Sequence, residues 1–330
     1  MRLRQILAIL TMVMMSATSA NAAEPILIRF SHVVAEDTPK GVGARMFKDL
    51  AEKKFPGRVT VEVYPASQRF DDDQVLDALL LGDVEMAAPS LAKFNRWAKP
   101  LQVFDLPFLF RDVDHLHRFQ EGVVGTQLLQ TMLPMGLQGI AYWDGGFRVL
   151  SANVPLSTPA DAEALVFRIE PSDVFQEQYS RINAVGIPMA FGRVADAVRQ
   201  GVVNAQENSW SNIYAEGIHK LHSNYTELNH SYLGYMVVTS SDFWQGLPED
   251  IRTGLEEVLL QVRAEVNRLA AERAEERRDR VVAEGGVAIM RPDAKKLQAW
   301  KDAWLPVWEN FETEIGPEVI EAAIAAGSEQ

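Results

Sequence analysis

The chain has 330 residues, of which 47% are hydrophobic, and its formal net charge is −13 at pH 7. This length and apolar content allow one large or two medium domains with a sizeable core. The acidic balance argues against nucleic acid or an anionic membrane surface as a partner. The absence of cysteine excludes thiol nucleophiles and cysteine metal sites.

The N-terminus has the features of an export signal. Arg2 and Arg4 precede the apolar run 6–15, and the small residues after it end in Ala20-Asn21-Ala22. We predict a signal peptide over residues 1–22, cleaved after Ala22. An uncleaved anchor is the alternative, although the run is too short to span a bilayer as a helix. The mature chain would carry 30 basic against 45 acidic groups, and we expect it in the periplasm, held together by core packing instead of disulfides.

The first half of the mature chain alternates between strand-like and helix-like segments. Strands are expected at residues 26–33, 58–64 and 84–90. Thr38 as N-cap and Pro39 at the first helical position begin the first intervening helix. This β-α-β-α-β order predicts a parallel sheet with helices on its faces.

The same alternation recurs downstream and predicts a second α/β unit. Strands are expected at residues 139–143, 147–153, 164–170, 187–191 and 202–208. The apolar segment 234–240 reads as a strand that rejoins the first sheet.

A long helix is expected after Pro248. Apolar residues recur there at three- and four-residue steps, and the helix is expected to stop at Gly285-Gly286. At about 1.5 Å per residue it exceeds the span of one compact domain. A coiled-coil arm is the alternative, but the apolar stripe is short, which favours a helix lying along two domains.

These elements predict an α/β protein of two domains. We expect residues 23–145 plus 234–273 in the first domain and residues 146–233 plus 274–330 in the second. The long helix would lie along both domains.

Motifs of common enzymes are missing from the sequence. It contains no G-x-S-x-G elbow, phosphate-binding loop, G-x-G-x-x-G or H-E-x-x-H. The carboxylates Asp71–Asp73 lie in a polar loop and read as solvated. We therefore expect neither catalysis nor a metal or cofactor.

Polar residues recur at or near the ends of the expected strands, namely His32, Ser90, Lys93, Arg148, Arg168 and Asn208. In open parallel sheets, ligands bind at the carboxyl ends of strands. A cationic, hydrogen-bonding cleft in an acidic protein suits a small anion, and arginine holds a carboxylate by two parallel hydrogen bonds. Four aromatic residues are candidates for the walls: Phe191, Trp210, Tyr232 and Tyr235.

Each of these residues also has a structural interpretation. Arg168 could pair with Glu170 or Asp173 as readily as with a ligand, and Asn208 could cap the following helix. Arg148 could lie on the surface near a Gly-Gly turn, and His32 could satisfy a turn carbonyl.

Several stretches together resemble the solute-binding subunit of tripartite ATP-independent periplasmic (TRAP) transporters, in its DctP-type, C4-dicarboxylate branch. They are "FSHVVAEDTPKG", "VEVYPASQ", "LGDVEMAAPSLAKF", "FDLPFLFRDVDHLHRF", "AYWDGGFR", "FRIEPSDVF", "GVVNAQENSWSNIY" and "NHSYLGYMVV". The resemblance implies two α/β domains that are joined by crossing strands and a long helix and that close on a ligand by a hinge. It also implies delivery of an organic acid anion to the small and large permease subunits of the membrane. We expect a monomer.

The resemblance assigns roles to particular residues. Arg168 matches the arginine that grips the substrate carboxylate, Asn208 its partner, Arg148 a second cationic position and Phe191 an aromatic wall. Ser90 lies where other branches carry a ligand-contacting acid. His32, Lys40 and Lys93 fall in segments typical of the dicarboxylate branch.

Three departures bear on the exact ligand: Asn204-Ala205 where Asp-Gly is usual, Gly192 and Ala195 where Ser and Tyr are common, and Arg69-Phe70 where Leu-Gly is common. The expected ligand is malate, succinate or fumarate. Another organic acid (a 2-oxo, hydroxy or sugar acid) and a periplasmic enzyme acting on small acids are the alternatives.

Overall fold

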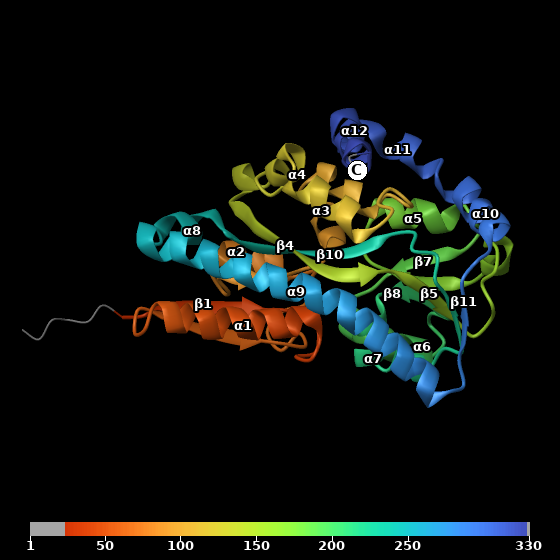
Figure 1. Cartoon of the computed structure of the whole chain (residues 1–330), viewed down its shortest axis with the longest axis horizontal. Coiled ribbons are helices and arrows are strands. Elements are labelled where there is room, and N and C mark those ends of the chain that lie inside the picture. The colour runs from red at the N-terminus through yellow and green to blue at the C-terminus, as the bar shows by residue number, and fades with distance from the viewer. Residues whose placement is uncertain (1–23, 329–330) are drawn as a thin grey trace, which may run out of the picture.

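The computed structural model describes residues 24–328, which form two sheets flanked by helices (Figure 1). The expected signal peptide, residues 1–22, lies outside the described residues. No helix within 24–328 combines the length and apolar composition that crossing a membrane requires.

The first sheet has the strand order β2-β1-β3-β10-β4. Its strands are β1 (Ile26–Ser31), β2 (Val59–Tyr64), β3 (Met86–Ala87), β4 (Leu137–Phe147) and β10 (Tyr232–Ser240). β1 pairs in parallel with β2 and β3, whereas β10 pairs antiparallel with β3 and β4. The return of β10 to this sheet is confirmed. The sheet is mixed, however, and the expectation of a parallel sheet holds only for its first three strands.

The second sheet has the order β11-β9-β5-β8-β6-β7. Its strands are β5 (Val149–Ala152), β6 (Val166–Ile169), β7 (Val185–Pro188), β8 (Ala205–Asn208), β9 (Asn224–Thr226) and β11 (Ala288–Met290). β6 is parallel to both β7 and β8, so the carboxyl ends of β6 and β8 meet at one edge. β5 is antiparallel to β8 and β9.

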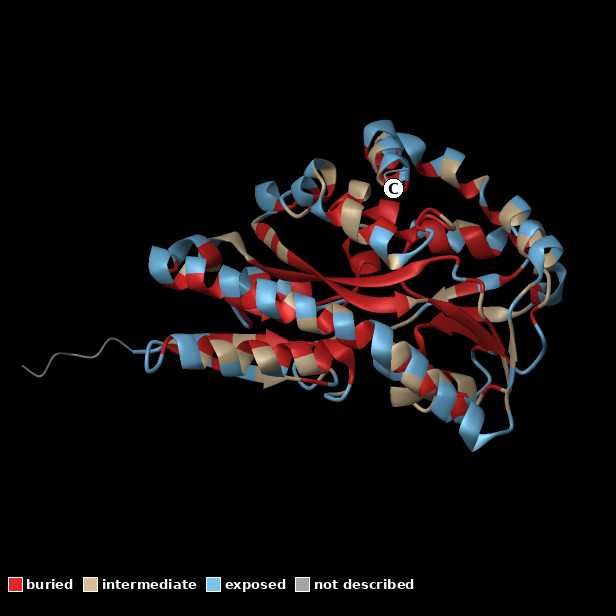
Figure 2. Cartoon of the chain, in the orientation of Figure 1, coloured by how far each residue is buried: buried red, intermediate tan, exposed pale blue. Residues whose placement is uncertain are grey.

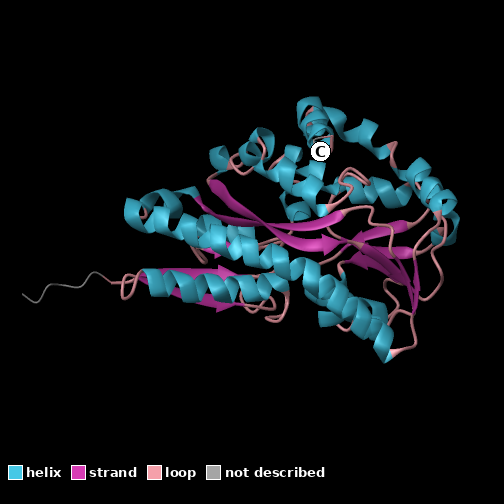
Figure 3. Ribbon diagram, in the orientation of Figure 1, coloured by secondary structure: helices cyan, strands magenta, loops and turns pink. Residues whose placement is uncertain are grey.

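Helices surround both sheets (Figure 3). They are α1 (Pro39–Lys54), α2 (Val75–Leu81), α3 (Val113–Glu121), α4 (Val123–Leu128), α5 (Asp173–Ser180), α6 (Val194–Arg199), α7 (Trp210–Ala215), α8 (Ser241–Gly246), α10 (Ala294–Trp304), α11 (Val307–Ile315) and α12 (Pro317–Ala326). The start of α1 is as expected: the Thr38 hydroxyl accepts a hydrogen bond from the Gly41 N–H (3.2 Å), and Pro39 is its first residue.

The long helix α9 (Glu249–Glu284) is confirmed and spans both sheets. It packs against α1 and β4 in its first part and against α7 further on. Its buried residues, among them Ile251, Leu255, Val262 and Val266, recur at helical spacing, and Figure 2 shows buried and exposed segments alternating along α9. The two strand crossings are the link from β4 into β5 and the segment leading into β10. Together with α9 they are the connections between the two sheets.

The last helices pack with the first sheet. Buried residues of α11 and α12, including Val307, Phe311 and Ile320, share one apolar core with Phe104 and Phe119. α12 lies against α3 (Figure 1). Packing therefore places α11 and α12 with the first sheet, unlike the sequence-based division, which put all of 274–330 in the second domain.

Candidate functional site

A narrow cavity lies between the two sheets. It is lined by Val33, Val34, Asp72, Ser90, Arg168, Glu170, Phe191, Asn208, Asn212, Leu233 and Tyr235. Its volume of about 10 Å³ is close to the room that one water needs. A molecule larger than water therefore needs this cavity to widen before it can enter.

Arg168 sits near the carboxyl end of β6, with 1% of its surface exposed. Its Nε and Nη2 donate to the Met189 carbonyl at 3.0 and 2.8 Å, and its Nη1 forms no hydrogen bond with the described residues. Burial lowers the pKa of the Arg168 guanidinium. This geometry fixes the plane of the guanidinium and leaves one of its edges for another acceptor.

Neither acid expected to compete for Arg168 binds it. Glu170 accepts from Arg148 Nη2 and from the Ser90 hydroxyl (3.1 Å), while Asp173 pairs with Lys99 at 2.7 Å. Burial alone would raise the pKa of Glu170, but Arg148, Arg168 and neighbouring cations lower it to about 2. Glu170 is therefore an ionised carboxylate neutralised by Arg148.

Arg148 is also held by a second carboxylate. Its Nη1 lies 3.6 Å from Glu207, which in turn accepts from Tyr179 Oη (2.8 Å) and lies 2.7 Å from His230 Nε2. The Arg148 guanidinium stacks over the Phe175 ring at 4.8 Å. Arg148 does not line the cavity, so the geometry favours a supporting role, and the direct ligand contact expected from the sequence stays a prediction.

Asn208 ends β8 and faces the same cavity as Arg168. Its Oδ1 accepts from the Ser209 N–H and from Asn212 Nδ2, both at 3.0 Å. Ser209, not Asn208, is the N-cap of α7. With its oxygen occupied, the Asn208 amide is oriented to donate through Nδ2.

Comparison with known proteins decides the family. The model of the family "bacterial extracellular solute-binding protein, family 7" (DctP) matches residues 30–314. The chain belongs to this family. It is 41% identical over 325 residues to the C4-dicarboxylate-binding periplasmic protein DctP of Shewanella loihica, covering 98% of this chain and 97% of that protein. It is 42% identical to the protein of the same name from Rhodobacter capsulatus, covering 93% and 92%.

Solved structures of similar proteins agree. A TRAP periplasmic solute-binding protein of Shewanella oneidensis with bound succinate is 44% identical, with a TM-score of 0.90 over 92% of this chain and 99% of the other. One from Pseudomonas aeruginosa with bound L-malate is 43% identical, with a TM-score of 0.85 over 87% and 100%. The two-domain α/β fold expected from the sequence is thereby confirmed.

Two lysines of this family 7 chain lie behind the cavity wall. Lys40 is buried, donates to the Ala88 carbonyl (2.9 Å) and lies 3.8 Å from the centre of the Tyr235 ring. Burial lowers the pKa of Lys40. Lys93 pairs with Asp73 at 2.7 Å. Neither lysine lines the cavity, whereas Ser90, Phe191 and Tyr235 do.

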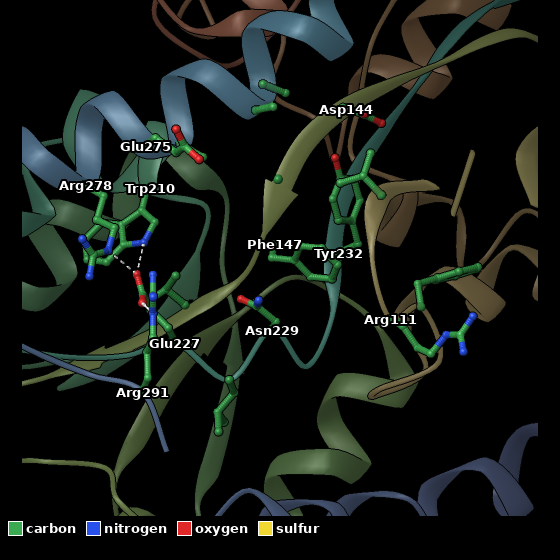
Figure 4. A pocket seen from close by; sticks show the side chains of 18 of the residues that line it. Arg111, Asp144, Phe147, Trp210, Glu227, Asn229, Tyr232, Glu275, Arg278 and Arg291 are labelled. Atoms are coloured by element: carbon green, nitrogen blue, oxygen red, sulfur yellow. Dashed lines mark hydrogen bonds and ion pairs between the residues drawn. The ribbon is translucent and has the colours of Figure 1, made fainter. Parts of the chain in front are cut away.

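His32 and Trp210 line other cavities. His32 faces a hollow bordered by Glu36, Arg45 and Lys48. Trp210 stacks near Tyr225 and donates from Nε1 to Glu227 (3.0 Å), in the cavity of Figure 4. We therefore leave both out of the proposed contact set, and their expected ligand contacts stay predictions.

Sequence reasoning missed several lining residues. Asp72 was read with its neighbours as solvated, yet it is only 7% exposed and faces the cavity. Burial raises its pKa. Its position in an acidic run hid it, because the sequence does not show which of three adjacent aspartates turns inward. Asn212 lies in the first turn of α7, directly after β8, and its Nδ2 donates to Asn208 Oδ1 at 3.0 Å, which brings it to the same cavity.

Proposed function

We propose that this protein is a periplasmic solute-binding subunit of a TRAP transporter that binds a C4-dicarboxylate, such as succinate, malate or fumarate, and delivers it to the small and large permease subunits. It would act by binding alone, without catalysis. The observation that carries the proposal is the buried Arg168 guanidinium, oriented by the Met189 carbonyl and directed at a cavity between two sheets.

Arg168 and Asn208 would hold one carboxylate of the ligand. Arginine suits this because its charge and paired N–H groups match a carboxylate, and Asn208 Nδ2 adds a neutral donor. Ser90, Tyr235 and Phe191 would meet the rest of the ligand. Three cations outside the cavity lining would balance the charges of nearby carboxylates. They are Arg148 for Glu170, Lys40 for Asp72 and Lys93 for Asp73.

The two sheets would be the two domains of a hinged binder. We propose residues 24–145, 234–273 and 305–328 as the first domain and residues 146–233 plus 274–304 as the second. Hinge motion would occur at the strand crossings, where Gly145 and Gly146 precede Phe147. Gly146 has φ of 109°, a conformation that other residues rarely adopt.

Calorimetric titration with succinate, L-malate, fumarate, galactonate and glucuronate tests the proposal. A C4-dicarboxylate should bind most tightly, and Arg168→Ala should weaken it about 100-fold or more, since two charge-assisted hydrogen bonds are worth about 1.5–3 kcal/mol each. Arg199→Ala, which breaks a surface pair with Asp196, is the matched control. Unchanged binding by Arg168→Ala would refute the clamp.

The same panel separates the alternatives. If a sugar acid binds more tightly than any diacid, the ligand is a sugar acid instead of a C4-dicarboxylate, and the transport role is unchanged. If proton NMR shows that a bound acid is converted into a product during incubation, the protein is an enzyme.

A further inference from the structure

A second and larger cavity lies where the crossing strands meet α9 (Figure 4). Its volume is about 640 Å³, against about 10 Å³ for the cavity at Arg168, and the two share no lining residue. Pockets that bind small molecules commonly measure about 300–1,000 Å³. The molecule thus keeps room for a ligand at its hinge while the cavity between the sheets is closed.

Small residues on α9 keep this hinge cavity open. Ala270, Ala271 and Ala274 face it where larger side chains would fill it. Opposite them, the rings of Phe147 and Tyr232 meet edge to face, 5.0 Å apart, and Trp210 stands at the other end (Figure 4). The walls are therefore mostly apolar and aromatic, which suits a ring or another flat apolar body.

The polar part of the lining is more cationic than acidic. Glu227 is the shared partner of Arg278 (2.7 Å) and Arg291 (2.6 Å), so one carboxylate faces two guanidinium groups. Lys301 lies 5.8 Å from the Phe108 ring and forms no ion pair with a described carboxylate within 4 Å. Arg111 donates to the Gly327 carbonyl.

Asp144 and Glu275 also line the cavity, and Asp144 pairs with His117 at 2.7 Å. Four lining cations against three carboxylates make this a locally positive surface in a protein of net charge −13.

We propose that the hinge cavity binds a small amphipathic anion, an apolar or aromatic body bearing one carboxylate or sulfonate, and that its binding favours the closed arrangement of the sheets. The apolar body would lie against Phe147, Tyr232 and the alanines of α9. The anionic group would point to Lys301 and Arg291, with the Asn229 amide, which projects into the cavity in Figure 4, as a further donor.

The hinge cavity is coupled to the cavity at Arg168 because its lining residues come from both sheets. β4 and β10 belong to one sheet, β5 to the other, and α9 spans both. A ligand that fits this shape binds the closed arrangement better than an arrangement in which the walls have moved, so it shifts the population toward closure. By linkage, the anion must raise the affinity of the protein for the diacid by the same factor by which the diacid raises its affinity for the anion. This coupling rests on the proposed function, whereas the hinge site itself does not.

Fluorescence titration with 1-anilinonaphthalene-8-sulfonate tests the site, with N-phenyl-1-naphthylamine as the same ring system without the charge. We expect one saturable site and at least tenfold tighter binding of the sulfonate. Ala274→Leu should weaken both probes at least tenfold, while Ala264→Leu, on the exposed side of α9, should leave both unchanged. Lys301→Gln should weaken binding of the sulfonate alone, about fivefold. Lys295→Gln, on the same helix, should change the binding of neither probe. Circular dichroism checks that each variant is folded.

Several results would overturn the site. They are the absence of saturable binding, equal affinity for the charged and neutral probes, equal effects of Ala274→Leu and Ala264→Leu, and loss of the sulfonate site in Arg168→Ala.

The coupling is measured by titrating succinate with and without saturating sulfonate. An increase in succinate affinity of about threefold or more is expected, and an unchanged affinity would remove the coupling. If wild type binds no diacid at all, the proposed function fails while the probe titrations still decide the hinge site.

Discussion

Arg148 and Arg168 show at the residue scale how far sequence reasoning reaches. Both follow apolar strand residues, and both are 1% exposed, so local sequence predicts two similar buried cations. Their partners separate them: Arg148 meets Glu170 and Glu207, whereas Arg168, among residues 24–328, hydrogen-bonds only to the Met189 carbonyl. Those partners lie 21 to 59 positions away in the chain, and their approach depends on the pairing of β5 with β8 and of β6 with β7 and β8, which no local pattern encodes.

The supporting role of Arg148 predicts a loss of stability. Arg148→Met would leave Glu170 and Glu207 buried without their cation, and removing one partner of a buried pair typically costs about 3–5 kcal/mol. Urea unfolding at pH 7 measures the change. Arg199→Ala, which removes an exposed pair, should cost less than about 1 kcal/mol. A folded Arg148→Met protein with unchanged stability but much weaker diacid binding would instead support direct contact with the ligand.

His32 predicts a pH dependence of stability. It is 1% exposed, neither ring nitrogen has a hydrogen-bond partner among the described residues, and burial together with the Lys40 charge lowers its pKa to about 3. The unfolded chain takes up the proton near pH 6.5 while the folded chain does not, so stability is fully present above that pH and falls as the pH drops toward 3. Between pH 7 and 5 this group should cost about 2 kcal/mol.

The comparison of His32→Gln with wild type isolates that contribution, because the pKa of His222 is also lowered, to about 4, by burial. Urea unfolding at pH 7 and pH 5 should show a smaller loss in the variant. An equal loss in both proteins would mean that His32 is protonated in the folded state.

At the scale of elements, strong local signals predicted β1, α1 and α9 almost to their ends. The expected strand 84–90 shrinks to Met86–Ala87, because the chain turns into a short 3-10 helix at Leu91. Segments 139–143 and 147–153 became β4 and β5, which belong to different sheets. The antiparallel pairs and the packing of α11 and α12 on the first sheet arise from contacts between distant segments, so periodicity alone did not reveal them.

The contact between α1 and α9 predicts the effect of one substitution. A Cβ at Gly43 would lie 2.3 Å from Val266 Cγ2 on α9. Replacing glycine by alanine inside a helix normally stabilises by roughly 0.5–1 kcal/mol, but here Gly43→Ala must push the helices apart, and we expect a net loss of about 1–3 kcal/mol. Gly246→Ala, whose added Cβ meets no atom within 4 Å, should be neutral or slightly stabilising. Denaturant midpoints compare the two, and a stabilised Gly43→Ala protein would contradict the close approach.

For the whole molecule, the closed arrangement is held by contacts between the sheets. The Ser90 hydroxyl donates to Glu170, Asn212 Nδ2 donates to Tyr235 Oη (3.2 Å), and Lys99 pairs with Asp173. The first two line the cavity, and the third lies outside it at the start of α5. Lys99 thus offers a way to change closure without touching the ligand.

Asp173→Lys should weaken diacid binding through closure alone. It places a second cation beside Lys99, which costs free energy only when the sheets are together, so the closed population and the apparent affinity fall. Exposed pairs are worth about 0–1 kcal/mol, and reversal of one charge should lower succinate affinity about three- to tenfold in 50 mM NaCl. Because both side chains are about half exposed, 500 mM NaCl should remove most of the difference from wild type. Asp196→Lys on α6, which breaks a pair within one domain, should leave succinate affinity unchanged in either salt. A loss in Asp173→Lys that persists in 500 mM NaCl would point to a distorted site instead of a shifted closure equilibrium.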